Sequence, residues 1–139
     1  MTAKQLELEV VTPERRLFSA PVDEIVLPGI EGYLGVLPGH AALLTELGMG
    51  EITYTAGGKA GSFVVAGGWC EIQPERVSIL AERCERPEEI DTARALRSKE
   101  RAEAILKRTD LSEDEQREAQ KHLRRALIRL TASQKGPGM

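Results

Sequence analysis

The chain has 139 residues, of which 41% are hydrophobic and 29% charged, and its formal net charge is -3 at pH 7. This length allows one modest hydrophobic core with an appendage rather than two cores of equal size. The acidic balance argues against a general nucleic-acid binder, which carries a basic face or stripe. No apolar stretch near the N-terminus is long enough for a signal peptide or a membrane span, so a cytosolic protein that binds other proteins is expected.

Period-two alternation predicts β-strands in the first part of the chain. The first run alternates polar side chains with Leu6, Leu8 and Val10, as in a strand with one buried face. Further strands are expected at residues 23–27, 51–55, 62–65, 69–73 and 76–80. Gly57-Gly58 suits a tight hairpin, because glycine accepts the positive φ angles that such turns need. Many short antiparallel strands of this kind predict a β sandwich or a barrel.

Two cysteines, Cys70 and Cys84, lie near the end of this region. Neither belongs to a Cys-x-x-Cys pair or to a cluster with zinc-ligand spacing, so free thiols and no metal site are expected. A hairpin that turns near Pro74-Glu75 places Cys70 opposite about Leu80, which leaves Cys84 out of its reach. An internal disulfide is therefore not expected.

The chain lacks the residue constellations that are typical of enzymes. Its two histidines lie outside any nucleophile or metal motif, with His40 expected in a turn or an interface and His122 on the polar side of a helix. Four glycines are expected to form turns, because no helix follows them as a dinucleotide fingerprint requires: Gly29, Gly32, Gly35 and Gly39. The pattern argues against an independent enzyme.

Beyond Cys84 the composition changes, because glycine becomes rare and alanine, glutamate, lysine and arginine predominate. This change predicts a boundary between a sandwich domain of residues 1–85 and a helical domain of residues 86–139. A first helix is expected from about Pro87 to Lys107, with acidic residues in its first turn, where the helix dipole favours them.

A second helix is expected from Ser112 to about Ala132, because Ser112-Glu113-Asp114-Glu115 matches a capping box. Helical spacing gives each helix one apolar stripe, and the two stripes are expected to face each other in an antiparallel hairpin. The first stripe is Ala95, Ser98, Ala102 and Ile105, and the second is Ala119, Leu123, Ala126, Leu127 and Leu130. Small side chains bring the helices close but bury little apolar area, so the hairpin is expected to be able to open.

Charged residues of the two helices converge at the end of the hairpin that is distant from its turn. In an antiparallel pair that turns near Asp110, Asp91 faces Arg129, and Arg94 lies near Arg125. Several guanidinium groups beside one carboxylate suit a polyanion such as a nucleotide phosphate. From the charge pattern alone, an ordinary solvated ion-pair network of little net energy is the simpler explanation.

Residues 32–45, Gly-Tyr-Leu-Gly-Val-Leu-Pro-Gly-His-Ala-Ala-Leu-Leu-Thr, resemble a signature of the ε subunit of F-type ATP synthases. Segments 67–72, 77–82 and 91–95 extend the resemblance over nearly the whole chain. The resemblance implies a β sandwich of about ten strands followed by a two-helix hairpin. It also implies a non-catalytic central-stalk (rotor) subunit of a proton-translocating complex, which couples the c ring and the γ subunit to ATP synthesis from ADP and phosphate.

The same resemblance implies a set of partners. The sandwich would bind the γ subunit and rest on the c ring, below the α and β subunits of the catalytic head, at the cytoplasmic face of the bacterial cell membrane. The loop with Glu31, Gly32 and Tyr33 would face the c ring, and His40 with the following strand would lie towards γ. No nucleic acid is expected as a partner, and the membrane is reached only through the complex.

Some bacterial members of this family bind ATP in the hairpin through an Ile/Leu-Asp-x-x-Arg-Ala motif, which residues 90–95 match. No cofactor is required, but the resemblance implies a regulatory ATP, bound as MgATP, at six residues: Glu85, Asp91, Arg94, Arg101, Arg125 and Arg129. Without ATP, the helices of such members extend into the catalytic head and block hydrolysis, which implies contacts of Lys121, Arg124 and Arg125 with the β subunit. Two alternatives remain: a purely structural stalk subunit without ATP sensing, and a free-standing β-sandwich module that binds a ligand.

Overall fold

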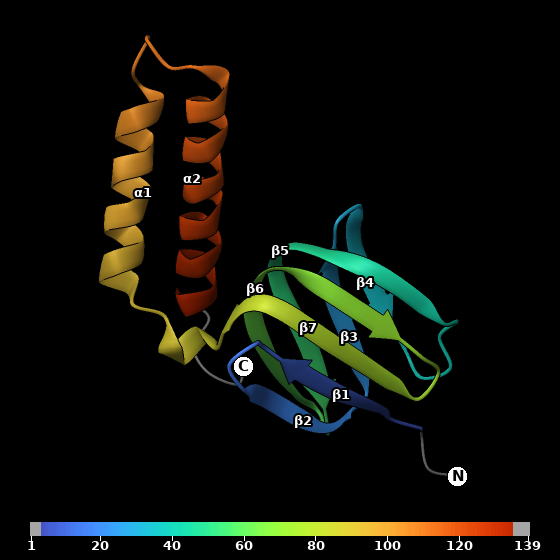
Figure 1. Ribbon diagram of the computed structural model, residues 1–139. Coiled ribbons are helices and arrows are strands. Elements are labelled where there is room, and N and C mark those ends of the chain that lie inside the picture. The colour runs from blue at the N-terminus through green and yellow to red at the C-terminus, as the bar shows by residue number, and fades with distance from the viewer. Residues whose placement is uncertain (1–3, 135–139) are drawn as a thin grey trace. The chain divides into compact units, whose positions relative to one another are not determined.

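The computed structural model describes residues 4–134. It divides into two compact units, one ending at Arg86 and the other beginning at Pro87. The first unit is built from strands and the second from helices (Figure 1). The elements, in chain order, are β1 Leu6–Val11, β2 Arg16–Val22, β3 Glu24–Gly29, β4 Gly32–Val36, β5 Leu43–Ala56, β6 Lys59–Ile72, β7 Arg76–Glu85, the 3-10 turn η1 Pro87–Glu89, α1 Thr92–Leu106 and α2 Glu113–Gln134.

The strands of the described chain form one seven-stranded sheet in the order β2-β1-β7-β6-β5-β3-β4. The sheet folds over on itself, because Phe18 of the edge strand β2 packs on Tyr54 of β5, with ring centroids 4.9 Å apart. The side chains between the two layers make a continuous hydrophobic core. The expected class, a β sandwich followed by a helical hairpin, is confirmed.

The expected number of about ten strands was too high, since the described chain has seven. The strands expected at 62–65 and 69–73 are parts of β6, which has 14 residues. Gly67 and Gly68, with φ angles of 78° and 129°, bend β6 without ending it. The register with β5 does not change at this bend, because Met49 pairs with Ala66 on one side of it and Leu47 pairs with Gly68 on the other. A glycine pair that resembles a turn in the sequence is therefore a bend within a strand.

The antiparallel pairing expected for many of the strands is present, but β1 pairs with β7 in parallel, with Leu8 beside Val77. The expectation that Gly29 and Gly35 form turns was wrong, because they lie in β3 and β4, whereas Gly32 and Gly39 do adopt positive φ angles of 135° and 88°. Parallel pairing joins segments far apart in the sequence, so no local turn signal announces it.

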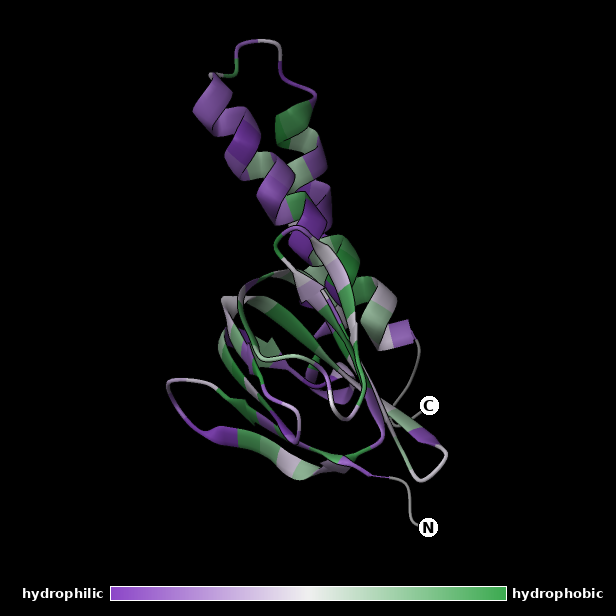
Figure 2. Ribbon diagram, turned by 90° about the vertical axis from the view of Figure 1, so that its right-hand side faces the viewer, coloured by the Kyte–Doolittle hydropathy of each residue, from purple (hydrophilic) through white to green (hydrophobic). Residues whose placement is uncertain are grey.

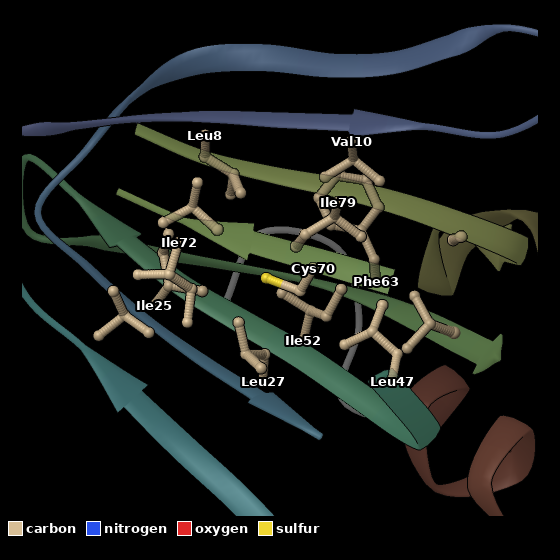
Figure 3. Packing of buried hydrophobic residues seen from close by; sticks show 14 of the residues in the cluster. Leu8, Val10, Ile25, Leu27, Leu47, Ile52, Phe63, Cys70, Ile72 and Ile79 are labelled. Carbon is tan, nitrogen blue, oxygen red and sulfur yellow. The ribbon is translucent and has the colours of Figure 1, made fainter. Parts of the chain in front are cut away.

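The core of the sandwich consists of inward-facing residues from its strands (Figure 3). Leu6, Leu8 and Val10 are fully buried, which confirms the alternation predicted for the first strand. Phe63 is the largest fully buried side chain. Cys70 points its sulfur into this cluster, and burial, aided by the charge of Glu71, raises the pKa of its thiol from 9.0 to about 12.

Both cysteines are free, as expected, with Cys70 buried and Cys84 half-buried. Cys70 lies opposite Ile79, one residue from the predicted partner, and Cys84 lies opposite Val65. We therefore expect a thiol reagent such as DTNB at pH 8 to label only Cys84 in the native protein, because the Cys70 thiol stays protonated and inaccessible. Cys70 should react only after denaturation, and Cys84→Ser should abolish native labelling. Rapid release of two equivalents from the native wild type would contradict this burial.

The helical unit departs from expectation at its first residues. Pro87–Glu89 forms a separate 3-10 turn, and α1 begins only at Thr92. Asp91 has an extended backbone, and its side chain caps α1 by accepting the Arg94 N–H at 3.0 Å. The capping box of α2 is confirmed, because Ser112 Oγ accepts the Glu115 N–H at 3.1 Å and a Glu115 carboxylate oxygen accepts the Ser112 N–H at 3.2 Å.

The helices pack as an antiparallel hairpin through four buried alanines: Ala95, Ala102, Ala119 and Ala126. Both alanine pairs are seven residues apart, so two turns of one helix can match two turns of the other. The assignment of Leu127 to this stripe was wrong, because 44% of Leu127 is exposed. It lies one residue beyond Ala126, on the outer side of a narrow contact. Hydrophilic residues cover most of both helices (Figure 2).

Candidate functional site

The turn between β3 and β4 carries three of the residues expected at an interface. Glu31 and Gly32 are exposed at this turn, and Ile30 beside them is 58% exposed. The Ile30 N–H donates to the Glu46 carbonyl at 2.9 Å, which ties the turn to β5. Tyr33 is also largely exposed, but its hydroxyl oxygen accepts the Glu51 N–H at 3.3 Å. The structure thus places Glu31 and Gly32 at the tip and directs Tyr33 towards β5.

His40 lies in a turn that is fastened to another turn of the sandwich. The Gly39 N–H donates to the Pro74 carbonyl at 2.8 Å, and the His40 N–H donates to the Leu37 carbonyl at 3.1 Å. The His40 ring nitrogen Nδ1 lies 2.7 Å from the Ala41 carbonyl oxygen. His40 is half-buried. Its position follows from the Pro-Gly turn before it.

An exposed apolar stripe was not predicted from the sequence. It consists of Leu44, Trp69 and Leu80, which are 65%, 49% and 59% exposed, and is called the Trp69 stripe below. Trp69 pairs directly with Leu80 across β6 and β7. Leu44 pairs with Glu71, two residues beyond Trp69, and so shares its face of the sheet. The sequence did contain a sign of this stripe. Trp69 is a large apolar residue directly before the buried Cys70, so in a strand it must face away from the core.

The arginine cluster belongs to the helical unit. The start of α1 and the end of α2 lie at the same end of the hairpin (Figure 1). Arg94 therefore lies at the end that also carries Arg125 and Arg129, while Arg101 lies farther along α1. Arg94 and Arg101 are exposed, and Arg125 and Arg129 are half-buried. Glu85 is the last residue of β7, in the sheet unit.

The Nε atom of Arg125, in this cluster, is buried. Arg125 Nε has no hydrogen-bond partner among the described residues. Leaving a buried charged donor unsatisfied costs about 1–3 kcal/mol or more, so an acceptor from outside the chain would stabilise it. Asp91, which is already engaged at the cap of α1, also fixes the backbone of Arg94. The arrangement is suited to an anion that brings several acceptor oxygens.

Two of the three residues expected to contact a partner of the hairpin are exposed, namely Lys121 and Arg124. Arg125, the third, is half-buried because it follows Arg124 by one step around the helix. His122 is exposed as expected and lies 3.4 Å from Glu118 one turn earlier. The outer side of α2 thus presents positive charge beside the exposed Leu127.

Two negative findings apply to residues 4–134. Within this range, no group of three or more His, Cys, Asp or Glu side chains is placed to hold a metal ion. None of the helices in this part of the chain combines the length and apolar character needed to span a bilayer.

Family models cover nearly the whole chain. The model described as ATP synthase, Delta/Epsilon chain, beta-sandwich domain matches residues 5–87. The model described as ATP synthase, Delta/Epsilon chain, long alpha-helix domain matches residues 88–134. The two matches follow each other in the order in which the strands and helices occur.

Curated relatives and solved structures agree with these models. A Dehalococcoides mccartyi protein named ATP synthase epsilon chain is 45% identical over 131 residues, 94% of each chain. A Geobacter metallireducens protein of the same name is 40% identical over 133 residues, 96% of each chain. A chain of the Euglena gracilis mitochondrial ATP synthase (OSCP/F1/c-ring) shares the fold, with a TM-score of 0.78 at 24% identity over 95% of this chain and 82% of that one. The protein therefore belongs to the ATP synthase delta/epsilon chain family, whose epsilon chains are non-catalytic subunits of that complex.

Proposed function

We propose that this chain is a central-stalk (rotor) subunit of the proton-translocating F-type ATP synthase, coupling the c ring and the γ subunit to ATP synthesis from ADP and phosphate. The observation that carries the proposal is the Trp69 stripe, exposed on a chain whose relatives are named ATP synthase epsilon chain. Contiguous exposed apolar side chains mark interaction surfaces, and tryptophan is enriched among residues that dominate binding energy.

The proposed coupling role uses two parts of the sandwich, in residues 1–85. The Trp69 stripe and the turn with His40 bind γ. The exposed tip with Glu31, Gly32 and Tyr33 faces the c ring. The subunit lies at the cytoplasmic face of the bacterial cell membrane, which it reaches only through the complex and its α and β subunits.

A regulatory role is proposed for the hairpin, residues 86–139, which binds MgATP through Asp91, Arg94, Arg101, Arg125 and Arg129, together with Glu85. Support comes from the buried, unsatisfied Arg125 Nε, because phosphate oxygens would supply its missing acceptor. The competing proposal is a purely structural hairpin whose arginines are solvated ion-pair partners. The narrow alanine contact between α1 and α2 favours a hairpin that responds to ligands, because little apolar area holds it closed.

In the absence of ATP, we propose that Lys121, Arg124 and Arg125 bind acidic segments of the β subunit and restrain ATP hydrolysis. Lys121 and Arg124 are exposed, so they are available for such a contact. The attraction would weaken with rising salt, because exposed charges are screened over a Debye length of about 8 Å at physiological ionic strength.

Titration of the full chain with MgATP tests the regulatory proposal. Hydrogen exchange of α1 and α2 amides should slow on binding, and Arg125→Ala should lower the affinity about 10- to 150-fold, as expected for loss of a charge-assisted hydrogen bond. Arg117→Ala is the matched control, because Arg117 is an α2 arginine near the turn that already pairs with Asp114 at 2.8 Å. Unchanged hairpin exchange up to millimolar MgATP would leave the structural hairpin as the better account.

A further inference from the structure

Tyr33 occupies a space that exists only because residue 50 is glycine. A Cβ atom built at Gly50 would collide with the Tyr33 hydroxyl and lie 3.3 Å from Tyr33 Cζ and 3.0 Å from Pro28 Cβ. Gly50 does not have a positive φ angle, so its backbone does not itself require glycine. The absence of a side chain at residue 50 therefore leaves the space that the Tyr33 side chain occupies.

The Tyr33 hydroxyl also fills a gap in the hydrogen bonding of the sheet. In the β3–β5 register, Val26 pairs with Thr53 and Gly29 pairs with Leu47, and the described chain shows no β3–β5 pair between them. Within this gap, Tyr33 Oη accepts the Glu51 N–H at 3.3 Å. The Glu51 N–H on β5 is thus bonded to a side chain from β4.

This bond reaches across one strand. The sheet order ends β5-β3-β4, so the backbone of β4 pairs with β3 at the edge of the described sheet. Tyr33 extends past β3 and fastens β4 to β5 directly. Together with the bond from the Ile30 N–H to the Glu46 carbonyl, it ties both arms of the β3–β4 turn to the same strand.

We propose that Tyr33 is a positioning residue that holds the tip formed by Ile30 and Glu31 in one conformation for binding. The proposal rests on the proposed contact between this tip and the c ring, and it assigns the contact itself to Ile30 and Glu31. Ile30 offers an exposed apolar side chain and Glu31 an exposed carboxylate, which suit an apolar surface and a hydrogen-bond donor on a partner. A tip held in its bound conformation loses less entropy on binding.

Two independent substitutions release the Tyr33 side chain. Tyr33→Ala removes it, and Gly50→Ala displaces it, because the colliding atom is the far end of an exposed side chain that can swing away. Both should raise the hydrogen-exchange rates of the Ile30 and Glu51 amides at least about tenfold, because the hydrogen bond or the tether that protects each is lost. Tyr33→Phe, which keeps the ring, should affect Glu51 more than Ile30.

A double-mutant cycle shows whether the packing of Tyr33 on Gly50 causes the change in exchange rate or whether the two substitutions act independently. In the Tyr33→Ala background, Gly50→Ala should add no further increase in exchange, because the ring it displaces is already gone. Gly35→Ala is the control, because Gly35 lies in β4 with Tyr33 and a Cβ atom there would meet nothing within 4 Å. This variant should leave the exchange rates of the Ile30 and Glu51 amides unchanged. Unchanged Ile30 and Glu51 exchange in both single variants, or additive effects in the double variant, would overturn the positioning role.

Binding to a purified γ–c ring subcomplex then distinguishes this inference from the function on which it rests. Ile30→Ala, Glu31→Ala and Tyr33→Ala should each weaken binding, and Tyr33→Ala should do so with Ile30 and Glu31 still present. If Ile30→Ala and Glu31→Ala leave binding unchanged, the contact with the ring fails while the exchange results stand. If those two variants weaken binding but Tyr33→Ala and Gly50→Ala do not, the contact survives and the positioning role fails.

Discussion

Replacement of Gly68 by alanine should lower the free energy of unfolding of the sheet unit by about 3 kcal/mol or more. Gly68 has a φ angle of 129°, which side-chain-bearing residues rarely adopt. A Cβ atom here would also collide with the Leu80 carbonyl oxygen and lie 2.8 Å from Ala81 Cα. These are backbone atoms of the neighbouring strand, so relief requires β6 and β7 to separate.

Urea unfolding followed by the fluorescence of Trp69, the single tryptophan of the chain, measures this effect next to the substituted residue. Gly35→Ala is the matched control, because Gly35 also lies in a strand but its Cβ position is open and its φ angle is not positive. That variant should change the free energy of unfolding by less than about 1 kcal/mol. Equal urea midpoints for the Gly68 and Gly35 variants would show that this bend of β6 tolerates a side chain.

The second large effect is expected on binding rather than on stability. Trp69→Ala should weaken association with the γ subunit by about 30- to 1,000-fold, the range of 2–4 kcal/mol that truncation of a central interface aromatic costs. Half of the Trp69 side chain is exposed, and its partner across the strands, Leu80, is exposed as well. The truncated protein should therefore fold with a free energy of unfolding within about 1 kcal/mol of the wild type.

Titration of γ with the purified variant measures the affinity, and circular dichroism checks the fold. Leu80→Glu offers a second variant, because a charge introduced beside Trp69 must be desolvated in an apolar interface. Thr55→Ala is the control, since Thr55 is exposed at the other end of β5. Wild-type affinity in both the Trp69 and Leu80 variants would show that γ does not bind the Trp69 stripe. The coupling proposal would then lose its main support.

Local signals predicted the elements whose bonds are local. The capping box at Ser112 was predictable because donor and acceptor lie three residues apart, and both of its hydrogen bonds are present. The burial of Leu6, Leu8 and Val10 followed from period-two alternation, which is a property of a single strand. The convergence of Arg94, Arg125 and Arg129 at one end of the hairpin followed from helical spacing and antiparallel pairing, while ATP binding at these residues stays a prediction.

Three features depended on segments that are distant in sequence. In the sequence, Gly67 and Gly68 resemble the residues of a turn. In the structure they lie inside β6, where atoms of β7 leave no room for a side chain at either position. Trp69 belongs to an exposed stripe only because β6 pairs with β5 and β7, which bring Leu44 and Leu80 to the same face. The role of Gly50 is visible only with Tyr33 above it.

The sequence by itself determined the family, the succession of sandwich and hairpin, and the caps and turns of individual elements. These depend on short-range periodicity, charge and backbone preference, which neighbouring residues express without help from the rest of the chain. Tertiary structure alone decided the strand count, the parallel β1–β7 pair, the exposed Trp69 stripe and the burial of Arg125 Nε. Each of these depends on which distant segment lies against a given residue, and that choice is made by the collective burial of the core.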